Sequence, residues 1–312
     1  MPRTWLEWLC AIAVLSVAAV TAARYFAFEV GPFAWLIAFT PYIGLAAVVL
    51  CVVGFATRVL PIALLATGCA VLQLSWLVPL FVSDSDVPEY GKTLTVMTSN
   101  ILFGRGDPAA IVDLVRDHNV DLLSVQELTP EAAVGLRDAG LNEVLEYRWL
   151  DASQAGMGIW SRYPLADLPA GSQVRWPAIG RHVDIPDLPL SFIAVHPAAP
   201  LTPDHAKWTH DQPLLRAALH SVPGAVVVAG DFNATLDHGI MRSLQADGFT
   251  DAAEAVGAGL NATWPQESRS PIPLFAIDHV MHRDVTLWPL TTQTAVVPGS
   301  DHRAVIATYR WV

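Results

Sequence analysis

The amino-acid sequence predicts a membrane-anchored α/β protein, in which three transmembrane helices precede a domain of mixed sheet covered by helices. Two observations lead to this fold class. The 312 residues are 53% hydrophobic and 15% charged, with a mean hydropathy of +0.41, and nearly all of the charge lies after residue 82. In that second part, strand-like segments alternate with helix-like segments, which is typical of α/β domains.

The predicted membrane domain covers residues 1–82. It contains three apolar stretches near or above the length of about 20 residues that crosses a bilayer: Trp5–Ala23, Phe33–Ala56 and Val59–Val82. It holds only five charged residues: Arg3, Glu7, Arg24, Glu29 and Arg58. The first stretch also resembles a signal peptide, because Arg3 precedes an apolar run that ends in small residues, and this alternative stays open.

The positive charges predict the orientation of the three spans, because Lys and Arg are enriched in cytoplasmic loops. Arg3 precedes the first span and Arg58 separates the second from the third, whereas Arg24 lies between the first two. By two against one, the N-terminus faces the cytoplasm, and three crossings place residues 83–312 outside. We therefore expect a multi-pass protein of the cytoplasmic membrane with an extracytoplasmic catalytic domain.

Cysteine usage and charge restrict the chemistry of the outer domain. Cys10, Cys51 and Cys69 all lie in predicted spans, so cysteine catalysis, disulfides and zinc–thiolate sites are excluded there. Residues 83–312 carry 15 Lys/Arg against 27 Asp/Glu, a net charge of −12, and the whole chain has only two lysines. This balance disfavours nucleic acid as a partner, because nonspecific binding depends on cationic contacts to phosphates. No protein partner is predicted.

The outer part is predicted to begin with a polar linker at 83–92, followed by a catalytic domain at 93–312. The predicted strands are Leu94–Ile101, Asp121–Glu127, Gly158–Arg162, Leu190–His196, Ala225–Ala229, Ala276–Met281, a region at Val285–Val297, and Ala304–Trp311. The predicted helices are Asp107–Asn119 with Asp107 as N-cap, a second opened by Thr129-Pro130 and closed by Gly140, and segments near Pro203–His220 and His238–Ala246. Several polar residues fall at the C-terminal ends of apolar strands, where active sites are commonly built.

The strongest local signal is an apolar strand that runs into Gly230-Asp231-Phe232-Asn233. If the extended backbone continues, the side chains of Asp231 and Asn233 project to the same side. The carboxylate can orient a water, and the amide can donate to a phosphoryl oxygen. A polar turn at a strand end would explain Asp231-Phe232-Asn233 alone, and the glycine before Asp231 and the companion motifs favour a functional role.

Two further strand ends predict a metal site. Asn100 ends the first strand and Glu127 ends the next, so parallel pairing of these strands would bring their oxygen ligands together. Mg²⁺ prefers one or two carboxylates together with waters and phosphate oxygens, and Mn²⁺ accepts similar ligands. Taken singly, Asn100 would be an ordinary strand-end cap and Glu127 a surface residue.

Histidine–aspartate pairing is predicted near the C-terminus. His302 needs a partner that fixes its tautomer and stabilises its charge, and Asp278 is assigned to it. Asp301 then remains as a candidate metal ligand or neighbouring carboxylate, and His196 as a donor that faces the phosphate. Arg105, just after the first strand, is a candidate phosphate clamp, although an ordinary surface role is the somewhat better explanation.

The other histidines receive no catalytic role. His118, His205, His210, His220, His238 and His282 are expected on the surface or in loops, and His182 and His279 are left unassigned.

Taken in order, these motifs resemble the series found in the endonuclease/exonuclease/phosphatase superfamily, over about residues 94–312. The matching pieces are Ser99-Asn100, Gln126-Glu127, His196, Gly230-Asp231-Phe232-Asn233, Ile277-Asp278-His279 and Ser300-Asp301-His302. The resemblance implies a four-layer α/β sandwich of two packed sheets and Mg²⁺-dependent attack of water on phosphorus.

The resemblance also implies roles for the individual residues. Asn100 and Glu127 would hold the metal with Asp301 nearby, and Asp231 and Asn233 would position water and phosphate. His196 and His302 would stabilise phosphoryl charge or transfer protons, with Asp278 orienting His302. Whether Asp231 or His302 is the general base stays open.

Departures from the family pattern bear on the substrate. Ile101-Leu102 follow Asn100 where repair nucleases of the superfamily carry a further acid, and their active-site tyrosine has no clear counterpart. Three spans joined to such a domain resemble the VanJ-type teicoplanin-resistance proteins of actinomycetes, which implies an undecaprenyl-pyrophosphate-like substrate and a link to antibiotic resistance. We therefore predict a phosphoesterase that hydrolyses a lipid-linked phosphate or pyrophosphate.

Three other functions stay open. The first is an extracytoplasmic metal-dependent nuclease, which the same chemistry permits. The second is a sphingomyelinase-like or phospholipase C-like phosphodiesterase, in which Trp176, Trp208 or Trp264 touches lipid, although core packing is the ordinary role of such residues. The third is a non-catalytic binding or scaffold protein, which the complete set of catalytic residues disfavours.

Overall fold

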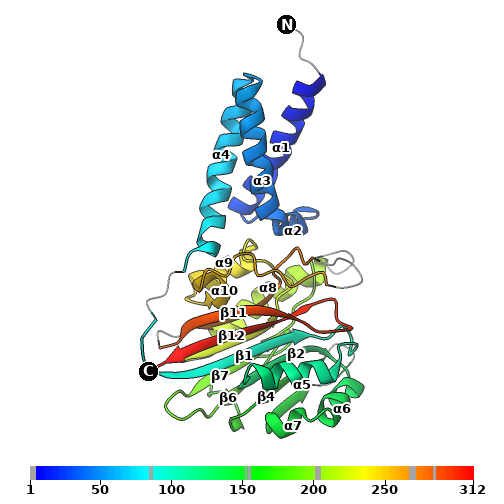
Figure 1. The fold of residues 1–312 in the computed structure, drawn as a ribbon, viewed down its shortest axis with the longest axis vertical. Coiled ribbons are helices and arrows are strands. Elements are labelled where there is room, and N and C mark those ends of the chain that lie inside the picture. The colour runs from blue at the N-terminus through cyan, green and yellow to red at the C-terminus, as the bar shows by residue number, and fades with distance from the viewer. Residues whose placement is uncertain are drawn as a thin grey trace.

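The computed structural model describes residues 5–83, 87–151, 153, 156–200, 205–266, 272–283 and 286–312. It consists of a bundle of long apolar helices standing on an α/β domain (Figure 1). Parts of four predicted segments lie outside the described residues: 1–4 of the membrane domain, including Arg3, 84–86 of the linker, 203–204 at the start of a predicted helix, and Val285 of the penultimate strand region.

The bundle contains α1 (Trp5–Tyr25), α3 (Thr40–Ala56) and α4 (Leu60–Leu77). Short helices lead into and out of them: α2 (Phe33–Leu36), η1 (Ile37–Phe39) and η2 (Val78–Phe81). Three helical stretches are long and apolar enough to cross a membrane: Glu7–Tyr25, Phe33–Ala56 and Leu60–Phe81. Small residues let them approach closely, since a Cβ added at Gly54 would lie 2.7 Å from the backbone nitrogen of Ala63.

The α/β domain is built on two six-stranded mixed sheets. The first has the order β11-β12-β1-β2-β4-β3, with β1 (Lys92–Asn100), β2 (Leu122–Leu128), β3 (Tyr147–Asp151), β4 (Gly156–Ser161), β11 (Trp288–Val296) and β12 (Arg303–Trp311). The second has the order β5-β6-β7-β8-β10-β9, with β5 (Leu165–Ala166), β6 (Ala178–Val183), β7 (Leu190–Val195), β8 (Val226–Asp231), β9 (Thr250–Asp251) and β10 (Asp278–Arg283). Among the described pairs, only β1–β2 and β7–β8 are parallel.

Apolar residues on both faces of each sheet produce a four-layer sandwich. Side chains such as Val96, Phe192 and Val227 fill the central layer between the sheets. The outer face of the first sheet is covered by α5 (Pro108–Asp117), α6 (Pro130–Asp138) and α7 (Leu141–Val144), and that of the second by α8 (His205–His220) and α9 (Gly239–Ala246). A short α10 (Ala252–Ala255) follows β9. The predicted fold class is confirmed.

The helix bundle is joined to the α/β domain by buried polar contacts at the loop formed by residues 233–239. Arg24 at the end of α1 pairs with Asp237 at 2.5 Å, and their side chains are only 9% and 14% exposed. Its guanidinium also lies 3.7 Å from the ring centroid of Trp76. Arg24, the one cation that opposes the predicted orientation, is thus bound to an acid of the α/β domain.

His238 makes a second contact with the bundle. Its Nδ1 accepts the backbone N–H of Thr235, which leaves Nε2 to donate to the carbonyl of Ala34 at 2.7 Å. The next residue, Gly239, donates its N–H to Glu29 at 2.5 Å. The expectation that His282 lies on the surface or in a loop is wrong, because it lies in β10 (Asp278–Arg283) and is 5% exposed. His238 does lie in a loop, as expected, but it is buried.

Candidate active site

The ends of three strands from two different sheets meet at one amide group. Asn100 closes β1, and its Nδ2 donates to Oε1 of Glu127 on β2 at 3.1 Å and to Oδ2 of Asp231 at the end of β8 at 3.0 Å. The parallel register of β1 and β2, which pairs Asn100 with Gln126, sets the first contact. Asn100 therefore links the two sheets at the edge where the predicted site residues gather.

The backbone around this edge is unusual. Glu127, Leu102 and Phe103 have φ angles of 56°, 46° and 49°, the left-handed region that non-glycine residues rarely occupy. Side chains of the site hold these turns, because Leu102 N–H donates to Asn100 Oδ1 at 3.0 Å and Phe103 N–H donates to Glu127 Oε2 at 2.8 Å. Backbone strain of this kind clusters at functional sites, where surrounding contacts enforce it.

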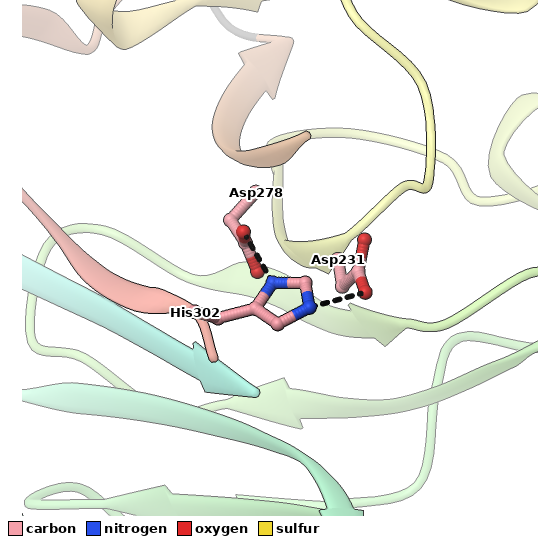
Figure 2. Close-up of side chains that lie close together, drawn as sticks. All are labelled: Asp231, Asp278 and His302. Atoms are coloured by element: carbon pink, nitrogen blue, oxygen red, sulfur yellow. Dashed lines mark hydrogen bonds and ion pairs between the residues drawn. The ribbon is translucent and has the colours of Figure 1, made fainter. Parts of the chain in front are cut away.

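A second group consists of Asp278, His302 and Asp231 (Figure 2). The carboxylate of Asp278 accepts from His302 Nδ1 at 2.9 Å, so the other ring nitrogen is directed toward Asp231 Oδ2, 3.8 Å away. The antiparallel register of β8 and β10 pairs Asp278 directly with Asp231. The structure thus brings together the His302 and Asp278 that the sequence paired across 24 residues.

Burial and neighbouring charges separate the protonation states of these groups. Burial would lower the pKa of His302, but the carboxylates of Asp278, Asp231 and Asp301 outweigh it and raise the pKa to about 10. Burial, followed by the negative charge of Asp278, raises the pKa of Asp231 to about 7. Burial and the positive charge of His302 lower the pKa of His196 to about 4. Near neutral pH, His302 is charged and His196 is neutral.

His196 and Asp301 complete the ring of polar groups. His196 directly follows β7, and its Nε2 lies 3.7 Å from Asp231 and 3.8 Å from Glu127. Asp301 Oδ1 lies 3.9 Å from His302 Nε2, and its Oδ2 accepts from Trp264 Nε1 at 3.2 Å. The structure thus brings His196 close to Asp231 and Glu127, and Asp301 close to His302.

Asn233 corrects one sequence expectation. The strand ends at Asp231, and Asn233 has a φ of 49°, so the backbone does not continue extended. A tight turn forms instead, in which Asn233 N–H donates to Asp231 Oδ1 at 2.8 Å. One hydrogen of the side-chain amide is already donated to the carbonyl of Pro197 at 2.9 Å, which leaves one for a ligand.

Arg105 is the one candidate that the structure leaves apart from the others. Its side chain is exposed in the turn after β1. Among the described residues, its guanidinium forms no hydrogen bond or ion pair.

The site has the donor chemistry of a divalent-cation site. Among the described residues, no Lys or Arg pairs with Glu127, Asp231 or Asp278, so a cluster of carboxylates is balanced only by His302. Carboxylate oxygens are the preferred ligands of Mg²⁺ and Mn²⁺. Asn100 would need to rotate its amide to offer an oxygen, because in the structure its nitrogen faces both carboxylates.

A cavity of about 460 Å³ opens beside the site. Asn233 and His302 of the site line it, together with His238 and Trp264. Trp35 and Phe39, which precede α3 in the helix bundle, line it as well. Two residues of the active site therefore face a partly open space that is lined by both parts of the molecule.

Two residues that hold the site together received no role in its chemistry from the sequence, which considered Trp264 only as a lipid contact in an alternative function. Ser300 donates to the carbonyl of Asn100 at 2.7 Å and accepts the N–H of His302 at 3.0 Å, joining β1 to the last motif. Its place directly before Asp301-His302 was the available signal. Trp264 carried no such signal, because its partner Asp301 is 37 positions away.

His279, which the sequence left unassigned, is part of the support beneath the site. Its Nδ1 contacts Asp251 at 2.9 Å, and its Nε2 contacts the carbonyl of Ala234 at 3.0 Å. Both partners are acceptors, so both ring nitrogens must donate. Burial opposes this charge, but the contact with Asp251 outweighs it and raises the pKa of His279.

Comparison with solved structures identifies the architecture. The 3′ phosphatase NExo from Neisseria, bound to a product DNA hairpin, is 18% identical, with a TM-score of 0.56 over 70% of this chain and 100% of that one. An AP endonuclease from Archaeoglobus fulgidus is 14% identical, with a TM-score of 0.56 over 69% and 98%. TDP2 from D. rerio, complexed with a single-strand DNA product, is 15% identical, with a TM-score of 0.56 over 70% and 99%. At these identities the likeness shows the fold.

Comparison with protein families is more specific. The comparison with curated proteins gave no significant match. The sequence model of the Endonuclease/Exonuclease/phosphatase family, in contrast, matches residues 97–302, about two thirds of the chain, and that segment includes the site residues from Asn100 to His302. The chain therefore belongs to the endonuclease/exonuclease/phosphatase family, whose members are metal-dependent phosphoester hydrolases.

Proposed function

We propose that this protein hydrolyses a lipid-linked phosphate or pyrophosphate, of the undecaprenyl-pyrophosphate type, at the extracytoplasmic face of the cytoplasmic membrane. It would act there as a multi-pass membrane enzyme of the VanJ type. The proposal combines the chemistry of the family with the position of the site relative to three apolar helices.

The proposed roles follow from the protonation states and contacts of the site. Glu127, a rotated Asn100 and the nearby Asp301 hold the divalent cation, which when bound polarises a phosphoryl oxygen and offsets its charge. Asp231, with a pKa of about 7, suits proton transfer from the attacking water. His302, charged and oriented by Asp278, donates to the phosphoryl group.

Two further donors contribute. His196 is neutral, and its Nε2 faces the carboxylates, where it can donate to a phosphoryl oxygen. Asn233 has one amide hydrogen left for the same purpose.

The position of the site is the observation that carries the lipid assignment. The segment 233–239 has Asn233 of the active site at one end and Asp237, His238 and Gly239 at the other. These three contact Arg24 at the end of α1, Ala34 in α2 and Glu29 in the connection between them. If the helices span a membrane, the site is fixed next to its surface, where a membrane-bound substrate is concentrated.

The proposed sidedness rests on the distribution of cations. Arg58 lies in the turn between α3 and α4, at the end of the bundle away from the α/β domain (Figure 1). Arg24 lies on the domain side, where its charge is bound to Asp237. Because Arg24 is held by this ion pair, its position is explained without the orientation rule. The other two cations of residues 1–82, Arg3 and Arg58, favour a cytoplasmic location for the end of the bundle away from the α/β domain.

A nuclease function is the less favoured candidate. Residues 83–312 carry a net charge of −12, which repels a polyanion and gives few cations for counterion release. A sphingomyelinase-like phosphodiesterase would share the position of the site, and only the substrate separates it from the favoured function.

A substrate panel tests the proposal. Detergent-purified protein is incubated with undecaprenyl pyrophosphate, plasmid DNA or sphingomyelin, each with Mg²⁺, Mn²⁺ or EDTA. We expect metal-dependent release of inorganic phosphate from the first and no cleavage of the others. Metal-dependent cleavage of DNA or sphingomyelin alone would retain the chemistry and refute the substrate.

A further inference from the structure

A continuous row of aromatic rings connects the helix bundle to the active site. The rings of Trp35 and Phe39 lie edge to face with centroids 5.5 Å apart, and Phe39 meets Phe275 of the α/β domain at 4.8 Å. Phe275 stacks on Trp264 at 6.0 Å. We call these four rings the aromatic wall.

The aromatic wall ends at Asp301, the carboxylate proposed near the metal, because Trp264 donates its Nε1–H to it. It forms one side of the cavity of about 460 Å³, whose remaining lining includes Ala38, Ala199, Pro200 and Ile277. Among the described residues, only His302, Asn233 and His238 add polar side chains to this lining besides the indole nitrogens. The volume falls in the range of about 300–1,000 Å³ that small-molecule sites occupy.

The cavity is not explained by a loose fit between the two parts of the molecule. The junction is bound at the Arg24–Asp237 pair and at the His238–Ala34 hydrogen bond, both of which are buried. A partly open apolar cleft beside such a bound junction, with the charged His302 in its lining, has the polarity of a site for an amphiphile.

We propose that this cavity binds the hydrocarbon chain next to the phosphate of the substrate, with the aromatic wall as its main contact surface. The inference rests on the proposed function and deepens it by naming where the lipid chain goes. A phosphate held at His302 and Asn233 puts its first carbons into the cavity, and the wall then leads toward the apolar helices.

The helix bundle is then part of the binding site as well as an anchor. Trp35 and Phe39 contribute to it from segments that precede α3, and Trp264, Phe275 and Ile277 contribute from the α/β domain. The occupant is a prenyl or alkyl chain, and prenyl chains combine flexible apolar carbons with double bonds that pack well on aromatic faces.

Chain length is the variable that tests the inference. Burial of one methylene strengthens binding by about fourfold at 25 °C. With full-length protein and Mg²⁺, we therefore expect kcat/KM for a homologous series of alkyl and prenyl phosphates to rise steeply with the first carbons. It should reach a plateau once the cavity is full, because later carbons lie in detergent or lipid.

Variants identify the contact surface. Trp35 is 40% exposed, so Trp35→Ala should fold, and Trp35→Phe keeps an aromatic face. Trp5→Ala is the matched control, because it removes a 74%-exposed tryptophan at the first residue of α1, which does not line the cavity. We expect the ratio of kcat/KM between long-chain and two-carbon phosphates to fall about tenfold or more in Trp35→Ala, to recover largely in Trp35→Phe, and to stay unchanged in Trp5→Ala.

The outcomes separate the inference from the function on which it rests. A wild-type protein that cleaves the two-carbon ester but no long-chain phosphate would refute both. A wild-type protein that cleaves long-chain phosphates, with a chain-length ratio that Trp35→Ala leaves unchanged, would retain the function and overturn the chain site. A ratio that falls equally in Trp5→Ala would assign the effect to the membrane environment and would also overturn it.

Discussion

The Arg24–Asp237 ion pair makes a testable connection between the helix bundle and the α/β domain. Both side chains are nearly buried, at 9% and 14% exposure, and the guanidinium also packs on Trp76. Burial already raises the pKa of Asp237, and the charge of Arg24 opposes that change. Replacing Arg24 with leucine would leave an acid enclosed without its partner.

The expected cost follows from this burial. Removing one partner of a buried ion pair costs about 3–5 kcal/mol, whereas replacing both by apolar residues is often neutral. For a domain of about 200 residues, 1 kcal/mol corresponds to about 2–4 °C in Tm. We therefore expect Arg24→Leu and Asp237→Leu each to lower Tm by roughly 6–20 °C, and the double variant to lower it by clearly less than either single change.

Thermal unfolding of the full-length protein in one detergent measures this. The matched control is Lys92→Ala, which breaks an ion pair with Asp187 of similar length, 2.8 Å, whose side chains are 59% and 78% exposed. Exposed pairs contribute little, so this variant should melt as the wild type does. Equal losses in Arg24→Leu and Lys92→Ala, or additive losses in the double variant, would refute the argument from burial.

Three further predictions concern the site and its support. Asp278→Asn should reduce kcat by about a hundredfold or more. It should also move the alkaline limb of the pH–rate profile to lower pH, because Asp278 is the nearest of the carboxylates that raise the pKa of His302 to about 10. An unchanged alkaline limb would exclude this role of Asp278. Glu127→Gln should raise the Mg²⁺ concentration for half-maximal activity by about tenfold or more. Titration with Mg²⁺ after EDTA treatment measures this concentration, and an unchanged value would exclude Glu127 from the metal site. The raised pKa of His279 adds to the free energy of unfolding. This contribution is complete below about pH 6.5, the pKa of an unpaired histidine, and is lost as pH rises through the folded-state pKa. The Tm of the wild type should therefore fall across this range, and the Tm of Asp251→Asn should not; an equal fall in the variant would contradict the assignment.

The strand ends of the site could be predicted because they depend on local sequence. Asn100, Glu127 and Asp231 each follow an apolar run, and pairing rules bring such ends to one edge. Asp278 and His302 were paired on chemical need, and the antiparallel register of β8 and β10 sets Asp278 beside Asp231. Asn233 was misplaced because a strand pattern does not show where the extended backbone stops.

Features that depend on partners distant in the chain could not be predicted from the sequence. His238 contacts a backbone carbonyl 204 positions away, and a carbonyl has no side-chain signature. Arg24 was counted as a topology signal, whereas its charge is bound to Asp237. Strand β6 was missed because its burial does not follow a clean alternation, and it includes Gly180, Arg181 and His182.

The most direct test of the account is phosphate release from a lipid pyrophosphate in a bilayer. Full-length wild-type protein and His302→Ala are reconstituted into vesicles that contain undecaprenyl pyrophosphate, and inorganic phosphate is followed with Mg²⁺ and after EDTA. We predict metal-dependent release by the wild type, loss on chelation, and loss in the variant. Release that persists in EDTA or in His302→Ala, or no release by wild-type protein that cleaves a soluble phosphoester, would contradict the central claim.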